Sequence, residues 1–242
     1  MGEIPVFPVG PAPFVGTCRR VEAGACFDWL RQGWAGFASA PAFWLAVAFL
    51  SLVVLLALWI VPGVGSMVAA LLFPIFMAGL LRVCRAQQDD EAPQLRDLLA
   101  GFRRNSHALL IIGLAAMLAF MLLGWLADWL ARAGVVGQAG VGTIIGSWVR
   151  GMIVVLPLSL PILMALWFAP ALAYFNDMPA AAAMRASFAA CAANWLAFVV
   201  YGLILMVLLF FAALPVFLGF LLLLPVGAGT LHASYRDIFP AS

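Results

Sequence analysis

The stretch FWLAVAFLSLVVLLALWIV, residues 43–61, decides the structural class of this chain. It holds no charged residue, and its length is close to the ~20 apolar residues that a helix needs to cross ~30 Å of hydrocarbon. Five more runs without an acid or an arginine follow it, at 64–81, 107–127, 151–175, 195–214 and 215–231. The sequence therefore predicts an all-α integral membrane protein with six transmembrane helices.

The composition agrees with this class. Of the 242 residues, 67% are hydrophobic and 9% are charged, whereas soluble domains carry about 25% charged residues. A net charge of +2 gives no basic surface of the kind that binds nucleic acid. We expect one membrane domain with membrane lipids, or another membrane protein, as its partners.

The arginines predict the orientation of the chain. All 12 basic residues are arginine, and ten of them fall before the first run, between even-numbered and odd-numbered runs, or after the last one. The other side of the predicted bundle carries only Arg132 and Arg150. Because cytoplasmic loops are enriched in arginine and lysine, the pattern predicts an inner-membrane protein with both termini in the cytoplasm.

The runs pair into three hairpins that resemble one another. The second helix of each hairpin carries a proline within similar text, with FPIFMAG at 73–79, LPILMAL at 160–166 and LPVGAGT at 224–230. A pseudo-threefold repeat is therefore predicted, with units at about 25–90, 93–177 and 180–239. Together these units form a single six-helix transmembrane domain over residues 25–239.

A short amphipathic segment precedes each hairpin. In LRDLLAGFRRNS, residues 95–106, the apolar Leu95, Leu98, Leu99 and Phe102 recur at helical spacing, and arginines occupy the opposite arc. Weaker versions precede the first and fifth runs. We expect interfacial helices whose arginines lie near lipid phosphates, and ordinary elbows between spans are the alternative. The candidate phosphate contacts are Arg82, Arg85, Arg96, Arg103, Arg104 and Arg236.

Residues 1–24 are predicted to be a disordered cytoplasmic tail. Pro5, Pro8, Pro11 and Pro13 each lack an amide donor and fix φ, which opposes helix and sheet alike. No basic segment followed by an apolar segment marks a cleaved signal peptide.

Prolines inside spans are the candidate pocket residues. Each removes a backbone hydrogen bond and bends its helix. Pro74, Pro161 and Pro225 recur at equivalent repeat positions, so they are candidates for lining a pocket between the three hairpins. Packing geometry inherited with the repeat is the alternative explanation.

The C-terminal ASYRDIF at 233–239, the stretches ASF at 186–188 and CAANW at 191–195, and the hairpin layout carry a resemblance. Over residues 25–239 the chain resembles an uncharacterised family of proteobacterial inner-membrane proteins. More loosely, it resembles the membrane domain that precedes some bacterial glycerophosphodiester phosphodiesterases, without their catalytic domain. The resemblance implies location and fold. Within the motif, we expect Tyr235 to be an interfacial anchor and Asp237 to pair with Arg236, with docking onto the Arg82 and Arg85 region as the alternative.

The sequence contains no pattern typical of a catalytic, metal or cofactor site. The serines and threonines of the spans have no evident base, and no metal-ligand spacing occurs. We therefore expect a non-enzymatic accessory or scaffold protein that binds lipid or another membrane protein. The alternatives are a passive or lipid-type transporter with a pocket between the hairpins, and an enzymatic cluster of His107, His232 and Asp237.

Overall fold

The computed structural model describes residues 16–61, 63–132, 144–213 and 219–240, which form helices and the loops between them. In chain order the helices are α1 (Ala25–Ser39), α2 (Pro41–Trp59), α3 (Val64–Gln88), the 3₁₀ helix η1 (Leu95–Phe102), α4 (Ser106–Arg132), α5 (Ile144–Trp167), α6 (Ala169–Phe175), α7 (Ala180–Ala193), α8 (Trp195–Ala213) and α9 (Phe220–Ile238). The prediction of an all-α protein is confirmed for this part of the chain.

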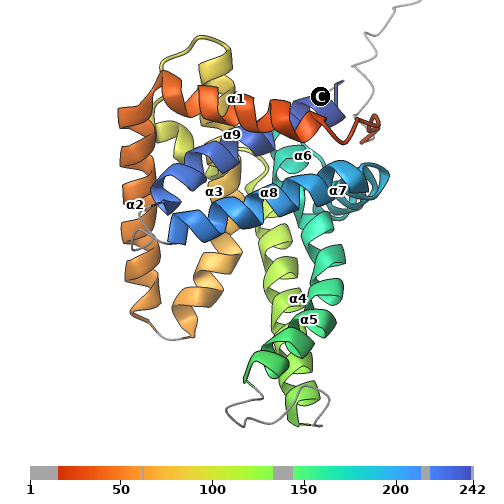
Figure 1. Ribbon diagram of the computed structural model, residues 1–242. Coiled ribbons are helices and arrows are strands. Elements are labelled where there is room, and N and C mark those ends of the chain that lie inside the picture. The colour runs from red at the N-terminus through yellow and green to blue at the C-terminus, as the bar shows by residue number, and fades with distance from the viewer. Residues whose placement is uncertain (1–15, 62, 133–143, 214–218, 241–242) are drawn as a thin grey trace, which may run out of the picture.

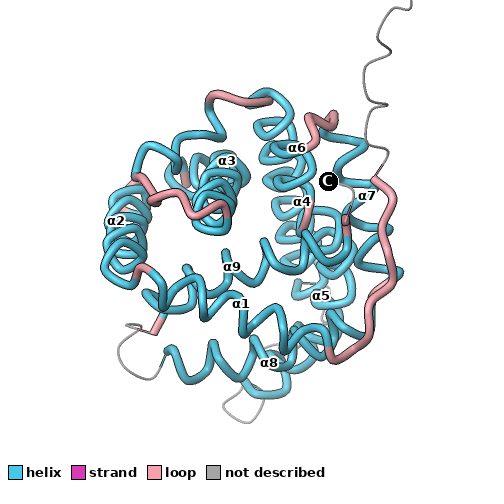
Figure 2. Tube along the Cα trace, turned by 90° about the horizontal axis from the view of Figure 1, so that it is seen from above, coloured by secondary structure: helices cyan, strands magenta, loops and turns pink. Residues whose placement is uncertain are grey.

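Two hairpins stand upright and side by side. In Figure 1, α2 pairs with α3 and α4 pairs with α5, and both hairpins run along the vertical direction of the view. Seen from above in Figure 2, α2, α3 and α4 appear end on, whereas α1, α8 and α9 lie lengthwise across the molecule. The third helix pair, α8 and α9, therefore lies across the first two pairs.

Five described helical segments are long and apolar enough to cross a membrane. They are Pro41–Leu58, Val64–Gln88, Ser106–Leu130, Val155–Phe175 and Trp195–Ala213, and they match the first five predicted runs. The sixth predicted run falls partly outside the described residues, and its described part belongs to α9. That helix ends in a polar turn with Arg236 and Asp237, so six spans are not confirmed.

The order of elements along the chain repeats three times as the sequence predicts, but the three units are not arranged alike in space. A short helix precedes two long helical segments three times, beginning with α1, η1 and α7. The third pair lies across the other two (Figures 1 and 2), so the three hairpins are not placed alike. The threefold repeat remains a prediction.

Proline and a buried serine set the break between α5 and α6. Pro170 has no amide hydrogen and stands in the first turn of α6, where none is needed. Ser187 of α7 is fully buried, and its hydroxyl accepts the Phe168 N–H at 2.9 Å and donates to the Met164 carbonyl at 2.6 Å. The backbone groups that the break frees are therefore satisfied by α7.

Glycines allow two close helix contacts. A Cβ on Gly33 of α1 would lie 2.5 Å from the Thr230 hydroxyl and 2.6 Å from the Val226 carbonyl of α9. On α3, a Cβ on Gly79 would lie 2.1 Å from the Leu98 carbonyl of η1. No side chain fits in either gap, so α1 is seated on α9 and η1 on α3 at backbone distance.

Candidate functional site

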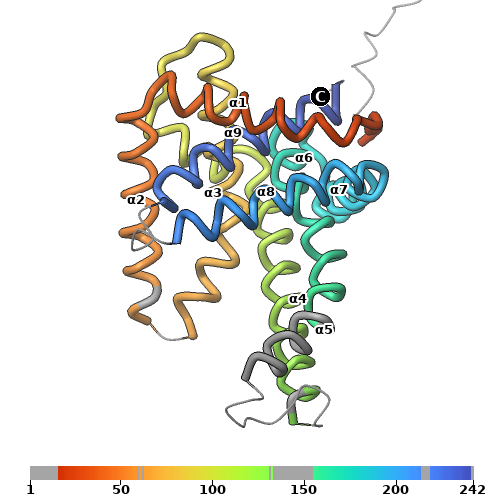
Figure 3. Tube along the Cα trace, in the orientation of Figure 1, coloured from red at the N-terminus to blue at the C-terminus, as the bar shows by residue number. Residues whose placement is uncertain are grey.

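One end of the molecule gathers most of the described arginines and both ends of the described chain. It comprises residues 16–31, the end of α3, η1, the start of α4, the turn after α6 and the last turns of α9; we call it the arginine-bearing end. The first described residues lie beside the end of α9 (Figure 3), and the Arg19 N–H donates to the Ile238 carbonyl at 2.9 Å.

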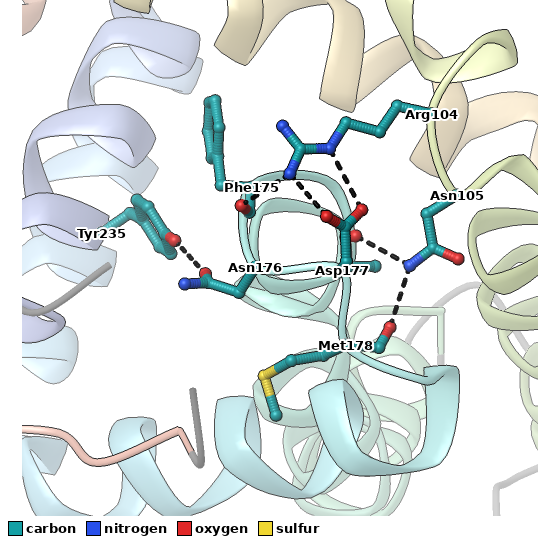
Figure 4. A network of polar contacts seen from close by, with 8 residues as sticks. Arg104, Asn105, Phe175, Asn176, Asp177, Met178 and Tyr235 are labelled. Carbon is teal, nitrogen blue, oxygen red and sulfur yellow. Dashed lines mark hydrogen bonds and ion pairs between the residues drawn. The ribbon is translucent and has the colours of Figure 1, made fainter. Parts of the chain in front are cut away.

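Arg104 and Asn105 hold the turn that follows α6 (Figure 4). The Arg104 guanidinium donates to both carboxylate oxygens of Asp177, at 3.0 and 2.5 Å. The Asn105 amide donates to the carbonyls of Ala173 and Met178, at 2.9 and 3.1 Å. The hydrogen bond from Arg104 lowers the pKa of Asp177 below its usual value.

Both turns use left-handed backbone. Asn105 has φ 48° and Asp177 has φ 52°, a region in which asparagine and aspartate are enriched because their short polar side chains bond locally. The conformation points the two side chains from one turn toward the other (Figure 4). The start of α4 and the end of α6 are thereby joined.

Tyr235 of the C-terminal motif joins this network from α9. Its hydroxyl donates to the Asn176 amide oxygen at 2.5 Å, and its ring stacks on Phe175 with centroids 5.6 Å apart. The Arg85 guanidinium lies over the same Phe175 ring, 5.2 Å from its centroid. Tyr235 is 2% exposed. It is therefore a buried residue that links α9 to the turn after α6, and not the interfacial anchor that the sequence predicts.

Arg236 and Asp237 have different partners, which corrects the expected pairing between them. Asp237 forms an ion pair with Arg19 and accepts from the Trp29 indole at 2.8 Å. Arg236 donates to the Gln88 amide oxygen at 2.7 Å. Consecutive residues on a helix point about 100° apart and do not face each other. The contact of Arg236 with the end of α3 agrees with the alternative of docking near Arg85.

The N-terminal segment is held by Asn194. This buried side chain accepts from the Val21 N–H at 2.8 Å and donates to the Arg19 carbonyl at 3.1 Å. The prediction of a disordered tail over residues 1–24 is therefore wrong for residues 19–21, because a distant asparagine supplies the hydrogen bonds. Residues 1–15 lie outside the described part of the chain.

The six candidate phosphate contacts fall into two groups. Four have polar partners: Arg82 pairs with Glu91 at 3.1 Å, Arg85 with Asp89 at 3.9 Å and Arg104 with Asp177, while Arg236 bonds to Gln88. Arg96 and Arg103 are exposed, and neither takes part in an ion pair among the described residues. Their assignment to lipid phosphate remains a prediction.

The segment that carries those two arginines also exposes apolar side chains. Leu95, Leu99 and Phe102 of η1 are each more than half exposed, whereas Leu98 is buried against α3. On α1, Phe27 and Trp34 are likewise exposed at 61% and 54%. In α1 and η1, some apolar side chains therefore point into the protein and others point outward.

The three prolines do not share one environment. Pro74 and Pro225 are buried and Pro161 is exposed. A cleft of about 230 Å³ is lined by Pro225, Trp44 and His232, among others, but by neither of the other two prolines. A larger cleft of about 590 Å³ lies between α1 and the end of α9, with Arg19, Arg31 and Arg236 in its lining. Neither cleft is the predicted pocket between the three hairpins, because neither is lined by Pro74 or Pro161.

Several residues of this end were not singled out from the sequence. Gln88 and Asn105 are central to it, and Gln87 bonds to the Trp44 indole at 3.1 Å. Their spacing along the chain follows no motif, because their partners lie more than 40 residues away. The one available signal was that polar amides stand directly at the ends of apolar runs.

These observations define a multi-pass helical membrane protein. Its sequence is 28% identical over 198 residues to a probable inner membrane protein of Burkholderia thailandensis, a match that covers 76% of this chain and 73% of that protein. The similarity and the apolar helices together indicate a multi-pass location in the bacterial inner membrane. No protein-family profile and no solved structure matches the chain.

Proposed function

We propose that the protein is a non-enzymatic accessory or scaffold protein of the inner membrane, and that its arginine-bearing end binds anionic lipid from the cytoplasmic side. The observation that carries the proposal is η1. Arg96 of η1 and Arg103, which directly follows η1, lie beside the exposed Leu95, Leu99 and Phe102, which suits a segment at the boundary between headgroups and acyl chains.

The rigid seating of η1 supports this role. A Cβ on Gly101 would lie 2.4 Å from the Ile75 carbonyl of α3, and Gly79 allows the matching contact from the other side. Backbone contact at two points fixes which side chains of η1 face outward. The backbone positions from which the two arginines project are therefore fixed, which reduces the backbone entropy that this segment loses on binding.

Lipid analysis of the purified protein tests the proposal. Each arginine near an anionic surface contributes about 1 kcal/mol, so the double change Arg96→Gln and Arg103→Gln should weaken binding of anionic lipid roughly thirtyfold. The ratio of anionic to zwitterionic lipid that co-purifies with the detergent-solubilised protein is the measurement.

The matched control is Arg132→Gln, which removes one exposed arginine from the far end of α4. It should leave the lipid ratio unchanged. An unchanged ratio in the double variant would contradict lipid binding by η1. If a membrane protein co-purified with the wild type and was lost from the double variant, η1 would instead be a protein-binding segment.

The second candidate function, a lipid-type transporter, is favoured by one observation only. The described clefts lie against α9, with Pro225 in the smaller one. A passage between the hairpins would need Pro74 and Pro161 in a shared lining, so this function receives less support than lipid binding.

A further inference from the structure

The two clefts beside α9 adjoin each other. The larger one lies between α1 and the last turns of α9, and the smaller one lies between α1, α2, α3 and α9. Gln32, Ala35 and Ala233 line both. The Arg236–Gln88 hydrogen bond of 2.7 Å spans their boundary. A ligand that occupied both clefts would therefore lie beside the hydrogen-bonded Arg236 and Gln88.

Positive charge predominates in the larger cleft. Its lining holds three arginines, Arg19, Arg31 and Arg236, against two aspartates, Asp28 and Asp237. Arg19 is already paired with Asp237, whereas Arg31 is exposed and forms no ion pair among the described residues. Planar guanidinium groups in this setting favour a phosphate group.

His232 lines the smaller cleft and has a ring nitrogen that needs a hydrogen-bond donor. The residue is 3% exposed, and its Nε2 lies 3.0 Å from the Gln88 amide oxygen. The same oxygen accepts from Arg236, since a guanidinium only donates. Nε2 therefore carries the ring hydrogen, and Nδ1 is an acceptor.

That acceptor has no hydrogen-bond partner within the described chain. A buried acceptor without a donor is destabilising, and most such groups in proteins are paired. The His232 ring lines the smaller cleft, while Nδ1 itself has almost no accessible surface, so a ligand in this cleft supplies the missing donor only if the side chains that cover Nδ1 shift.

The missing donor is a hydroxyl in preference to an ammonium group. Burial, together with the nearby Arg236 and Arg85, lowers the pKa of His232 to about 4. The surroundings that oppose a positive charge on the ring oppose one on a ligand beside it. A neutral hydroxyl meets the same acceptor without this cost.

We propose that the joined clefts bind a phosphate ester that carries a hydroxyl group. The phosphate lies on Arg31 and Arg236, and the hydroxyl donates to His232 Nδ1. A phosphoglycerol lipid headgroup and soluble glycerol phosphate share this chemistry. The inference rests on the proposed function only in expecting lipid at this end, because it uses a different surface from η1.

Native mass spectrometry of the full chain in detergent tests the proposal with two lipids. Phosphatidylglycerol carries a phosphodiester and hydroxyls, whereas phosphatidylmethanol carries the same phosphodiester without them. We expect phosphatidylglycerol to bind about tenfold more tightly, the ratio that one buried hydrogen bond supports. Equal binding of the two lipids by the wild-type protein would overturn the proposal without any variant.

Two substitutions of one residue separate the nitrogens. Glutamine at 232 retains a donor near the Nε2 position and removes the Nδ1 acceptor, so His232→Gln should abolish the preference for phosphatidylglycerol. Asparagine retains an acceptor near the Nδ1 position, so His232→Asn should keep the preference. The opposite pattern would overturn the assignment of the hydroxyl to Nδ1.

Arg31→Gln should weaken both lipids by about tenfold and leave their ratio unchanged; unchanged binding of both would overturn the phosphate position. Displacement of the lipid by soluble glycerol phosphate would support the soluble ester as ligand, and its failure would support the lipid. The Arg96 and Arg103 variants report on η1 alone. If they leave lipid binding intact while His232→Gln removes the preference, the proposed role of η1 fails and the cleft stands.

Discussion

The arginine-bearing end and the outer faces of the long helices differ in how their side chains are held. At the arginine-bearing end, Trp29, Tyr235 and Ile238 are at most 2% exposed, and side chains from distant parts of the chain bond to one another. On α8, by contrast, Leu203, Met206 and Phe210 are 62%, 70% and 64% exposed. Specific packing is thus concentrated at one end, while the outer faces need only be compatible with lipid.

The largest effect should come from removing a buried aromatic of the C-terminal motif. Phe239 is fully buried and its ring lies 5.5 Å from the Phe168 ring. Phe239→Ala should destabilise the protein by about 3–5 kcal/mol, because a large cavity remains in the core. Thermal unfolding in detergent measures this loss.

The contrast requires a matched change on the outer face. Phe210→Ala removes the same side chain from α8, where detergent or lipid fills the space, and should change stability by less than about 1 kcal/mol. Equal losses for the two variants would show that the outer face of α8 is packed as specifically as the arginine-bearing end.

A smaller effect is expected where α1 meets α9. Gly33→Ala places a methyl group within 2.6 Å of the Val226 carbonyl, so α1 must shift and stability should fall by about 1–3 kcal/mol. Gly36, on the same helix, has no atom within 4 Å of its Cβ position, and Gly36→Ala should be neutral or stabilise by up to about 1 kcal/mol. Chemical denaturation of the two variants distinguishes a seated helix from a loosely attached one.

The smallest effect concerns the exposed Arg104–Asp177 pair. In the folded protein the pKa of Asp177 is lowered by Arg104. The pair therefore stabilises the protein at pH values above the ordinary aspartate pKa of about 3.9. This contribution is lost as the pH falls through the lower pKa of the folded state. Because both side chains are about half exposed, the loss should be about 0–1 kcal/mol. Asp177→Asn should remove this part of the acid dependence, and an unchanged dependence would place the acid-sensitive group elsewhere.

The sequence predicts the apolar helices well because their signal is local. The run at 43–61 identifies α2 by the cost of charge in hydrocarbon alone, and Pro41 marks where it begins. The segment at 95–106 also predicts a short amphipathic helix, although the structure forms it as 3₁₀.

The arrangement of the arginine-bearing end was not predictable in the same way. Tyr235 bonds to Asn176, and Asp237 pairs with Arg19, across more than 50 residues of sequence in each case. Charge counting places these residues on one side of the membrane, but it carries no information on which partner each one finds. Such contacts hold the end of α9, and the hydropathy of α8, which lies across the hairpins, is that of an ordinary span.

The most direct test of the central claim is to map where anionic lipid touches the protein. Phosphatidylglycerol with a photoreactive group next to its headgroup is cross-linked to the purified full chain, and the adducts are located by peptide mass spectrometry. Lipid binding at the arginine-bearing end predicts adducts within residues 16–36, 86–104 and 232–240. Adducts spread evenly along the helices, or confined to the Trp125–Arg132 end of α4, would contradict it.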